Sequence, residues 1–141
     1  RNAFIMTSLL KEVINTGTAR KAKSLKREDI AGKTGTTNEL VDAWFAGFNP
    51  DMVTITWMGF DQPQSLGKHE SGSRAALPIW IDYMRPIIGE YPTKMVETPD
   101  GIIPLRINPK NGMLANKNED SIYEYFYDEF PPSDNAYFLL N

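Results

Sequence analysis

A short polar stretch, residues 31–38, brings together the kinds of group that bind anions. It reads Ala-Gly-Lys-Thr-Gly-Thr-Thr-Asn, so it contains one cation, three hydroxyl groups and two glycines. An apolar run, residues 41–48, follows almost at once and is typical of a buried strand. A strand edge of this composition can offer backbone N–H groups, hydroxyls and a positive charge to one ligand. The stretch therefore predicts an anion-binding edge beside a buried strand.

The triplet Gly32-Lys33-Thr34 also occurs in phosphate-binding loops, but its surroundings exclude that reading. Such a loop needs a glycine five positions before the Gly-Lys pair, and Arg27 stands there. It also needs a helix directly after Lys-Thr, so that backbone N–H groups point at the phosphate. An apolar aromatic strand follows instead. We therefore do not expect a nucleotide site.

Two apolar segments predict the sheet that carries this edge. Residues 41–48 have apolar side chains on both faces, which is typical of a central strand. The turn Asn49-Pro50-Asp51 separates them from residues 52–60, which are rich in β-branched and aromatic residues. A turn this short favours an antiparallel hairpin. Residues 33–60 are thus expected to form three strand segments, or two with a bent first one.

Helical periodicity brackets the predicted sheet on both sides. Residues 2–16 are amphipathic, and Gly17 is a natural end for that helix. A second helix is predicted over residues 74–88, with Ser73 as its N-cap. Pro86 is expected to end or kink it.

Residues 18–28 carry five cations in a short run. Such a cluster could bind an acidic partner or a lipid head group. We favour the simpler interpretation of a solvated loop. His69 and Glu70, in a later loop, are likewise expected to be solvated.

The composition changes after Glu90, where prolines, glycines and asparagines become frequent. Residues 102–107 could form a short strand and residues 113–115 another. Residues 119–134 are acidic and aromatic and are interpreted as an extended segment.

Composition limits the possible chemistry. The chain has 141 residues, 41% of them hydrophobic, and a net charge of −3, so nothing in its charge favours nucleic acid. It has no cysteine and one histidine, which argues against thiolate metal sites, a histidine metal site or a Ser-His-Asp triad. We predict no metal and no cofactor. No apolar run is long enough to span a membrane, and because the chain begins with Arg1 we interpret it as a piece of a longer one.

Several segments together resemble one enzyme family. Residues 31–38 and the following Asp-Ala-Trp-Phe-Ala-Gly look like the third signature of penicillin-binding proteins and serine β-lactamases. The combination with four other segments resembles the class A (bifunctional) penicillin-binding proteins; these are residues 6–10, 15–19, 57–61 and 72–80. The resemblance covers residues 1–90 and continues more weakly over residues 91–130.

The resemblance implies an α+β fold in which an antiparallel sheet is flanked by helices, the αβα transpeptidase fold, present only as its C-terminal part. Residues 1–90 would belong to the transpeptidase domain, and residues 91–141 would be an extended tail or small appended segment. The family also has two earlier signatures, Ser-x-x-Lys with the acylated serine, and Ser-x-Asn. Ser65 and Lys68 match the first spacing but lie after the Lys-Thr-Gly run, in a loop, so we attribute the match to coincidence. The nucleophile is expected in another part of the protein.

The function implied is that of a D,D-transpeptidase, which crosslinks peptidoglycan stem peptides through a serine acyl-enzyme and is acylated by β-lactams. Lys33 and Thr36 would act in catalysis, and Lys33, Thr34, Gly35 and Thr36 would bind the substrate. The remainder of the protein would supply both other signatures, a glycosyltransferase and an anchor in the inner membrane, with this part on the periplasmic side. A serine β-lactamase and a non-catalytic peptide-binding homologue are the alternatives. This chain alone is expected to be inactive.

Overall fold

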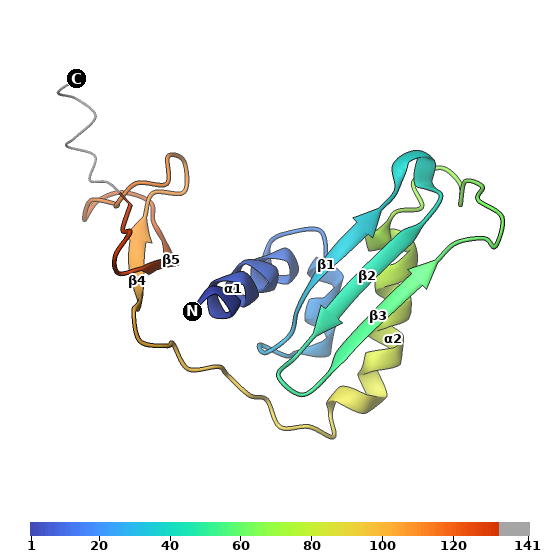
Figure 1. Ribbon diagram of the computed structural model, residues 1–141, viewed down its shortest axis with the longest axis horizontal. Helices are drawn as coiled ribbons and strands as arrows, with labels where there is room; N and C mark the ends of the chain where they lie inside the picture. The colour runs from blue at the N-terminus through green and yellow to red at the C-terminus, as the bar shows by residue number, and fades with distance from the viewer. Residues whose placement is uncertain (133–141) are drawn as a thin grey trace. The chain divides into compact units, whose positions relative to one another are not determined.

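The structure is a computed structural model that describes residues 1–132 and contains two compact units. One unit comprises residues 7–96, and the other joins residues 1–6 to the chain from residue 97 onward. Figure 1 shows the order of the elements. The helical segments are α1 (Asn2–Asn15), η1 (Arg20–Leu25), η2 (Asn38–Leu40), η3 (Gly72–Ala76) and α2 (Leu77–Ile88), and the strands are β1 (Ala31–Thr36), β2 (Ala43–Phe48), β3 (Val53–Met58), β4 (Ile102–Ile107) and β5 (Ile122–Tyr127).

The larger unit is built on a three-stranded antiparallel sheet in the order β1-β2-β3. Three strand segments were expected here, and the predicted central strand is β2. The hairpin between β2 and β3 is held by Asn49, whose side-chain oxygen accepts hydrogen bonds from the N–H groups of Asp51 (3.1 Å) and Met52 (2.8 Å). Asparagine favours tight turns for this reason.

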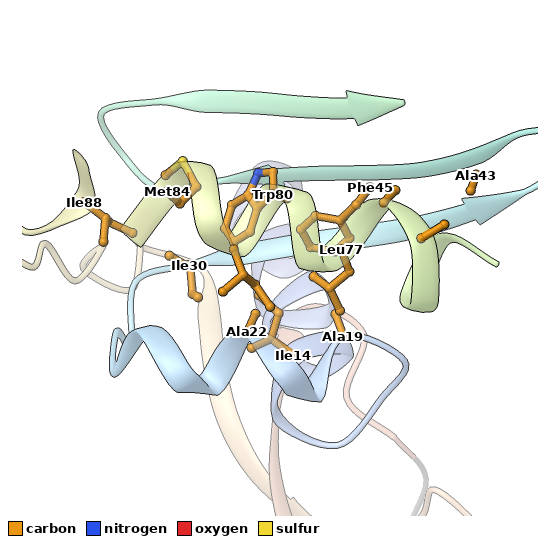
Figure 2. Close-up of a cluster of buried hydrophobic side chains, with 13 residues drawn as sticks. Ile14, Ala19, Ala22, Ile30, Ala43, Phe45, Leu77, Trp80, Met84 and Ile88 are labelled. Atoms are coloured by element: carbon orange, nitrogen blue, oxygen red, sulfur yellow. The ribbon is translucent and has the colours of Figure 1, made fainter. Parts of the chain in front are cut away.

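Helix α2 covers one face of this sheet, and η1 packs on the other side of the helix (Figure 2). The centre of the core is the edge-to-face contact between Phe45 of β2 and Trp80 of α2, whose ring centroids lie 5.0 Å apart. Trp80 also donates its indole N–H to the carbonyl of Thr54 at 3.1 Å, so its only polar atom is satisfied. Gly47 makes room for the indole, because a Cβ there would lie 2.5 Å from the ring.

The opposite face of the sheet is exposed in the part of the chain that the structure describes. Side chains alternate along β2, so that Phe45 is buried while Trp44 is 41% exposed. Val53 and Ile55 of β3 are 72% and 60% exposed. The antiparallel sheet and the α+β class are confirmed, and within residues 1–132 the helices of the larger unit cover one of the two faces.

The helical segment after the sheet begins earlier than the sequence predicted. It starts at Gly72 rather than Arg74, with the wider turn η3 leading into α2. The carbonyl of Ser71 accepts the N–H groups of Arg74 (2.9 Å) and Ala75 (2.8 Å), so Ser71, not Ser73, precedes the helix. Pro86 does not end α2, which continues to Ile88.

The basic run after α1 is more structured than the predicted loop. Residues 20–25 form η1, in which Ala22 is completely buried in the core. Alanine at this place brings η1 close to α2, and the neighbouring lysines stay exposed. The solvated-loop interpretation was therefore wrong for the backbone and for Ala22.

Arg27 was grouped with the solvated cations, and that was also wrong. Its guanidinium donates two hydrogen bonds to the buried carboxylate of Asp29, at 2.8 and 2.6 Å, and it also reaches the carbonyls of Ile88 and Tyr91 at 2.9 and 2.6 Å. Burial alone would raise the pKa of Asp29, but the hydrogen bonds from Arg27 and from the Lys94 N–H outweigh it, so the pKa lies below its ordinary value. The same hydrogen bond from Arg27 to Asp29 raises the pKa of Arg27. This ion pair fixes the end of α2 and the segment beyond it.

The smaller unit contains the two-stranded antiparallel sheet β4-β5. The strand predicted over residues 102–107 is β4, and the expected strand at 113–115 is reduced to one bridge between Ile107 and Leu114. Arg1 donates to Glu129 at 2.7 Å and lies over the ring of Tyr127. The predicted extended segment 119–134 contains β5, and its last residues, like the end of the predicted tail, lie outside the described residues. No helix in residues 1–132 is long and apolar enough to cross a membrane.

Candidate functional site at the edge of strand β1

The polar run forms strand β1, and its register divides the predicted site residues between two faces. Residues opposite one another in an antiparallel pair share a face of the sheet. Thr34 is paired with Phe45 and Thr36 with Ala43, so both hydroxyl side chains lie on the face that α2 covers. Lys33 and Gly35 lie on the opposite, exposed face.

The backbone of β1 also has a defined polarity. The N–H of Thr37 donates to the carbonyl of Asp42 at 3.1 Å, on the β2 side. Because backbone groups alternate along an antiparallel strand, the N–H of Thr36 and the carbonyl of Thr34 point to the other edge. That edge has no partner strand among the residues described. The ammonium of Lys33 bends toward it and donates to the Thr34 carbonyl at 2.8 Å.

Both threonine hydroxyls already have partners that orient them. The Thr36 hydroxyl oxygen accepts the N–H of Gly72 at 3.0 Å, which leaves its own proton available for an acceptor. The Thr34 hydroxyl lies 2.8 Å from the hydroxyl of Thr18. The edge therefore presents two fixed hydroxyls, a backbone N–H and a cation within four residues, and this set can bind a carboxylate and a carbonyl oxygen.

Gly72 sets the position of β1 relative to the helical segment behind it. A Cβ at this residue would lie 2.5 Å from the carbonyl oxygen of Gly35 and would also contact the carbonyl oxygen of Trp44. Both obstacles are backbone atoms, which cannot rotate away. Only glycine allows η3 to lie this close to β1 and β2, and only at this distance does the Gly72 N–H reach Thr36.

The turn between β1 and β2 is held by Asp42. Its carboxylate accepts the indole N–H of Trp57 at 2.9 Å, and its backbone N–H donates to the Thr37 hydroxyl at 2.8 Å. Within this turn Glu39 and Leu40 have φ values of 60° and 57°, in the left-handed region that non-glycine residues seldom adopt. The structural role expected for Asp42 is confirmed.

A hollow of about 470 Å³ lies beside the hydroxyl-bearing side of β1. It is lined by residues from two distant parts of the chain, which are Gly17, Thr18, Arg20, Lys21, Ser73 and Arg74. Thr18 bonds to Thr34, as described above, and Ser73 directly follows Gly72. The hollow thus adjoins both hydroxyls of the strand.

The Ser-x-x-Lys spacing does not produce a catalytic pair in the described residues. Ser65 and Lys68 are exposed in a loop, and the Ser65 hydroxyl accepts the N–H of Gly67 at 3.3 Å. His69 is exposed in the same loop, as expected. Nothing printed by the geometry links any of these side chains to β1.

Two further matches escaped the sequence analysis. Ser8 and Lys11 have the Ser-x-x-Lys spacing in the interior of α1, and within residues 1–132 neither is hydrogen-bonded to β1. Ser133 and Asn135 have the Ser-x-Asn spacing but lie outside the described residues. A systematic scan for both spacings would have found them. The described residues also hold no group of three or more side chains suited to a metal ion.

Known proteins similar to this chain share one name. It is 50% identical over 137 residues to penicillin-binding protein 1A of Pseudomonas aeruginosa and 52% identical over 103 residues to that of Neisseria lactamica. These alignments cover 96% and 73% of this chain but only 17% and 13% of the relatives. The chain therefore spans less than a fifth of the length of these relatives.

A solved structure agrees with this result. The crystal structure of penicillin-binding protein 1A from Haemophilus influenzae matches with a TM-score of 0.85 and 35% sequence identity, over 93% of this chain and 21% of the other. No protein-family model matches the chain.

Proposed function

Because this chain is a segment of a protein of the penicillin-binding protein 1A family, we propose that it forms the β-strand wall of a D,D-transpeptidase site. The reaction would be the crosslinking of peptidoglycan stem peptides, and β-lactams would acylate the same site. The nucleophilic serine would come from another part of the parent protein. The parent would also carry a glycosyltransferase and an anchor that holds this segment on the periplasmic side of the inner membrane.

The observation that carries the proposal is the free edge of β1. An extended peptide can pair with such an edge through its backbone, as a further antiparallel strand. The outward carbonyl of Thr34 and the outward N–H of Thr36 would then bond the substrate backbone. Gly35, between them, has no side chain to obstruct a close approach.

Each side chain at this edge has a physical task in acyl transfer. The serine oxygen attacks the carbonyl carbon of the penultimate D-alanine, and negative charge develops on the carbonyl oxygen. The N–H of Thr36 would stabilise that oxygen together with a donor from the missing part of the site. The C–N bond then breaks, the terminal D-alanine leaves with a proton on its amine, and an amine of a second stem peptide resolves the ester.

The terminal carboxylate of the substrate would be held by Thr34, Thr36 and Lys33. Thr36 is well prepared for this, because Gly72 occupies its oxygen as an acceptor and leaves its proton free to donate. Lys33 adds a positive charge and can hydrogen-bond the serine of the Ser-x-Asn signature. A second ammonium nearby, from the Ser-x-x-Lys signature, would make it harder to protonate both lysines. Lys33 would therefore influence proton transfer without being the base.

The experiment is acylation of the complete parent protein by labelled penicillin, followed over time by gel fluorescence. We expect a long-lived acyl-enzyme, because a transpeptidase waits for an amine acceptor. Rapid acylation with rapid hydrolysis would instead support a serine β-lactamase. A parent sequence without a Ser-x-x-Lys serine ahead of this segment, combined with no acylation, would support the non-catalytic homologue.

The isolated 141-residue chain provides the complementary measurement. Mass spectrometry after incubation with penicillin should show the unmodified mass, since the proposed nucleophile lies elsewhere. A covalent adduct at Ser8 or Ser65 would contradict the proposal that the serine comes from the rest of the parent protein.

A further inference from the structure

We propose that the hollow beside β1 is a second anion subsite, which binds a carboxylate carried by the substrate peptide in addition to its terminal one. The proposal rests on the proposed function, because it assigns a further recognition element to the same strand edge. Its ligand class is a peptide with two or more carboxylates.

The first argument is the charge around the hollow. Arg20, Lys21 and Arg74 all line it, and no acidic side chain does. In the described part of the chain none of these three cations has a carboxylate partner, whereas Arg27 and Lys94 are paired with Asp29 and Asp51. Three unpaired cations around one hollow repel each other, and a bound anion relieves that repulsion.

The second argument is that the two walls of the hollow are hydrogen-bonded to the strand. Thr18 forms one wall and bonds to the Thr34 hydroxyl at 2.8 Å. Ser73 and Arg74 form the other, immediately after Gly72, whose N–H bonds to the Thr36 hydroxyl at 3.0 Å. The cations are thus held beside the same two hydroxyls that would receive the terminal carboxylate. A peptide lying along β1 would bring its other acidic groups within their reach.

A membrane surface is the competing partner for these cations. The geometry favours the peptide, because Arg20 and Lys21 line a hollow together with Arg74, which comes from the other side of the fold. A lipid surface would attract all exposed cations of the basic run similarly, and Lys23 and Lys26 do not line the hollow. The hollow selects two of the run's cations.

The test uses the complete parent protein and pairs of peptides that end in D-Ala-D-Ala. In each pair one side chain, moved stepwise along the peptide, is Glu in one member and Gln in the other. We measure kcat/KM for release of D-alanine and take the Glu-to-Gln ratio. For the best-placed pair we expect a wild-type ratio of about ten, equivalent to about 1.4 kcal/mol, since the charge-assisted bonds are partly exposed to solvent.

The double variant R20Q/K21Q, and separately R74Q, should reduce this ratio toward one, and salt should reduce it in the wild type. The control K23Q/K26Q removes the same charge from the same run and should keep the wild-type ratio. Because the Gln peptide is measured with every variant, a general loss of activity cancels from the ratio.

A wild-type ratio near one at every position would overturn the inference, as would an equal fall in the control. Failure of the wild type to be acylated by penicillin would overturn the proposed function itself, and is a separate readout. Binding to phosphatidylglycerol vesicles that R20Q/K21Q weakens, with an unchanged Glu-to-Gln ratio, would assign the cations to a membrane and also overturn the inference.

Discussion

Replacing Gly72 by alanine tests whether the contact between η3 and β1 positions the candidate site. The new methyl carbon would lie 2.5 Å from the carbonyl oxygen of Gly35, about 1 Å closer than ordinary van der Waals contact. Both the obstacle and the substituted residue belong to the backbone, so the start of the helical segment and the strand must separate.

Two costs follow from this separation. Overpacking of a tight contact destabilises a fold by about 1–3 kcal/mol. Losing the hydrogen bond from Gly72 to Thr36 adds roughly 1 kcal/mol. We therefore expect G72A to lose about 2–4 kcal/mol of stability. A shift of about 1 Å in groups that position a substrate can lower the rate about 100-fold, and we expect a loss of this size in acylation.

The assay is the second-order rate constant of acylation by labelled penicillin in the complete parent protein, with calorimetry for stability. Gly89 provides a matched control at the other end of α2. A Cβ there would meet nothing within 4 Å, and its φ of −69° suits alanine. G89A should acylate like the wild type and unfold at a similar temperature.

Acylation of G72A at the rate of the wild type and of G89A would refute the reasoning. It would mean that the approach of η3 to β1 does not control the position of the strand edge. A stability loss without a loss of acylation would restrict Gly72 to a packing role.

Three further predictions concern single side chains. Lys33→Ala should lower penicillin acylation by orders of magnitude with little change in the unfolding temperature, because Lys33 is exposed, and unchanged acylation would remove it from the mechanism. Thr36→Val should reduce acylation about tenfold or more, whereas Thr36→Ser keeps the hydroxyl and should retain most of it; equal rates would exclude a role for this hydroxyl. Asp29→Asn should cost about 3 kcal/mol at neutral pH, because Arg27 is left buried without its counter-charge. Since the pKa of Asp29 is lowered by folding, its ionised form stabilises the protein above about pH 4 and this contribution disappears as the pH falls further. The stability difference between wild type and D29N should therefore be constant from pH 5 to 8 and shrink below about pH 4; an increase at acid pH would contradict the sign.

Local pattern was sufficient to predict the sheet. Alternating and β-branched residues identified β2 and β3, and the turn at Asn49 fixed their antiparallel pairing. The polar run 31–38 was recognised through its resemblance to a family signature, which also led to the candidate site.

Properties that depend on distant parts of the chain could not be predicted in the same way. Arg27 looked like one more surface cation, and its partners include carbonyls more than 60 residues away. The early start of the second helical segment depends on the close approach of Gly72 to Gly35, which is a tertiary contact. The hollow likewise joins residues 17–21 to residues 73–74, and no local pattern relates the two segments.

The one-sided burial of the larger sheet has a consequence for the life of this segment outside its parent. β3 is the outer strand of that sheet, has no second partner among the described residues, and exposes Val53, Ile55 and Trp57. An open strand edge that also carries apolar side chains is a template for association between copies. We therefore expect the liberated segment to aggregate at concentrations where the parent stays dispersed, and to be a preferred client of chaperones and proteases.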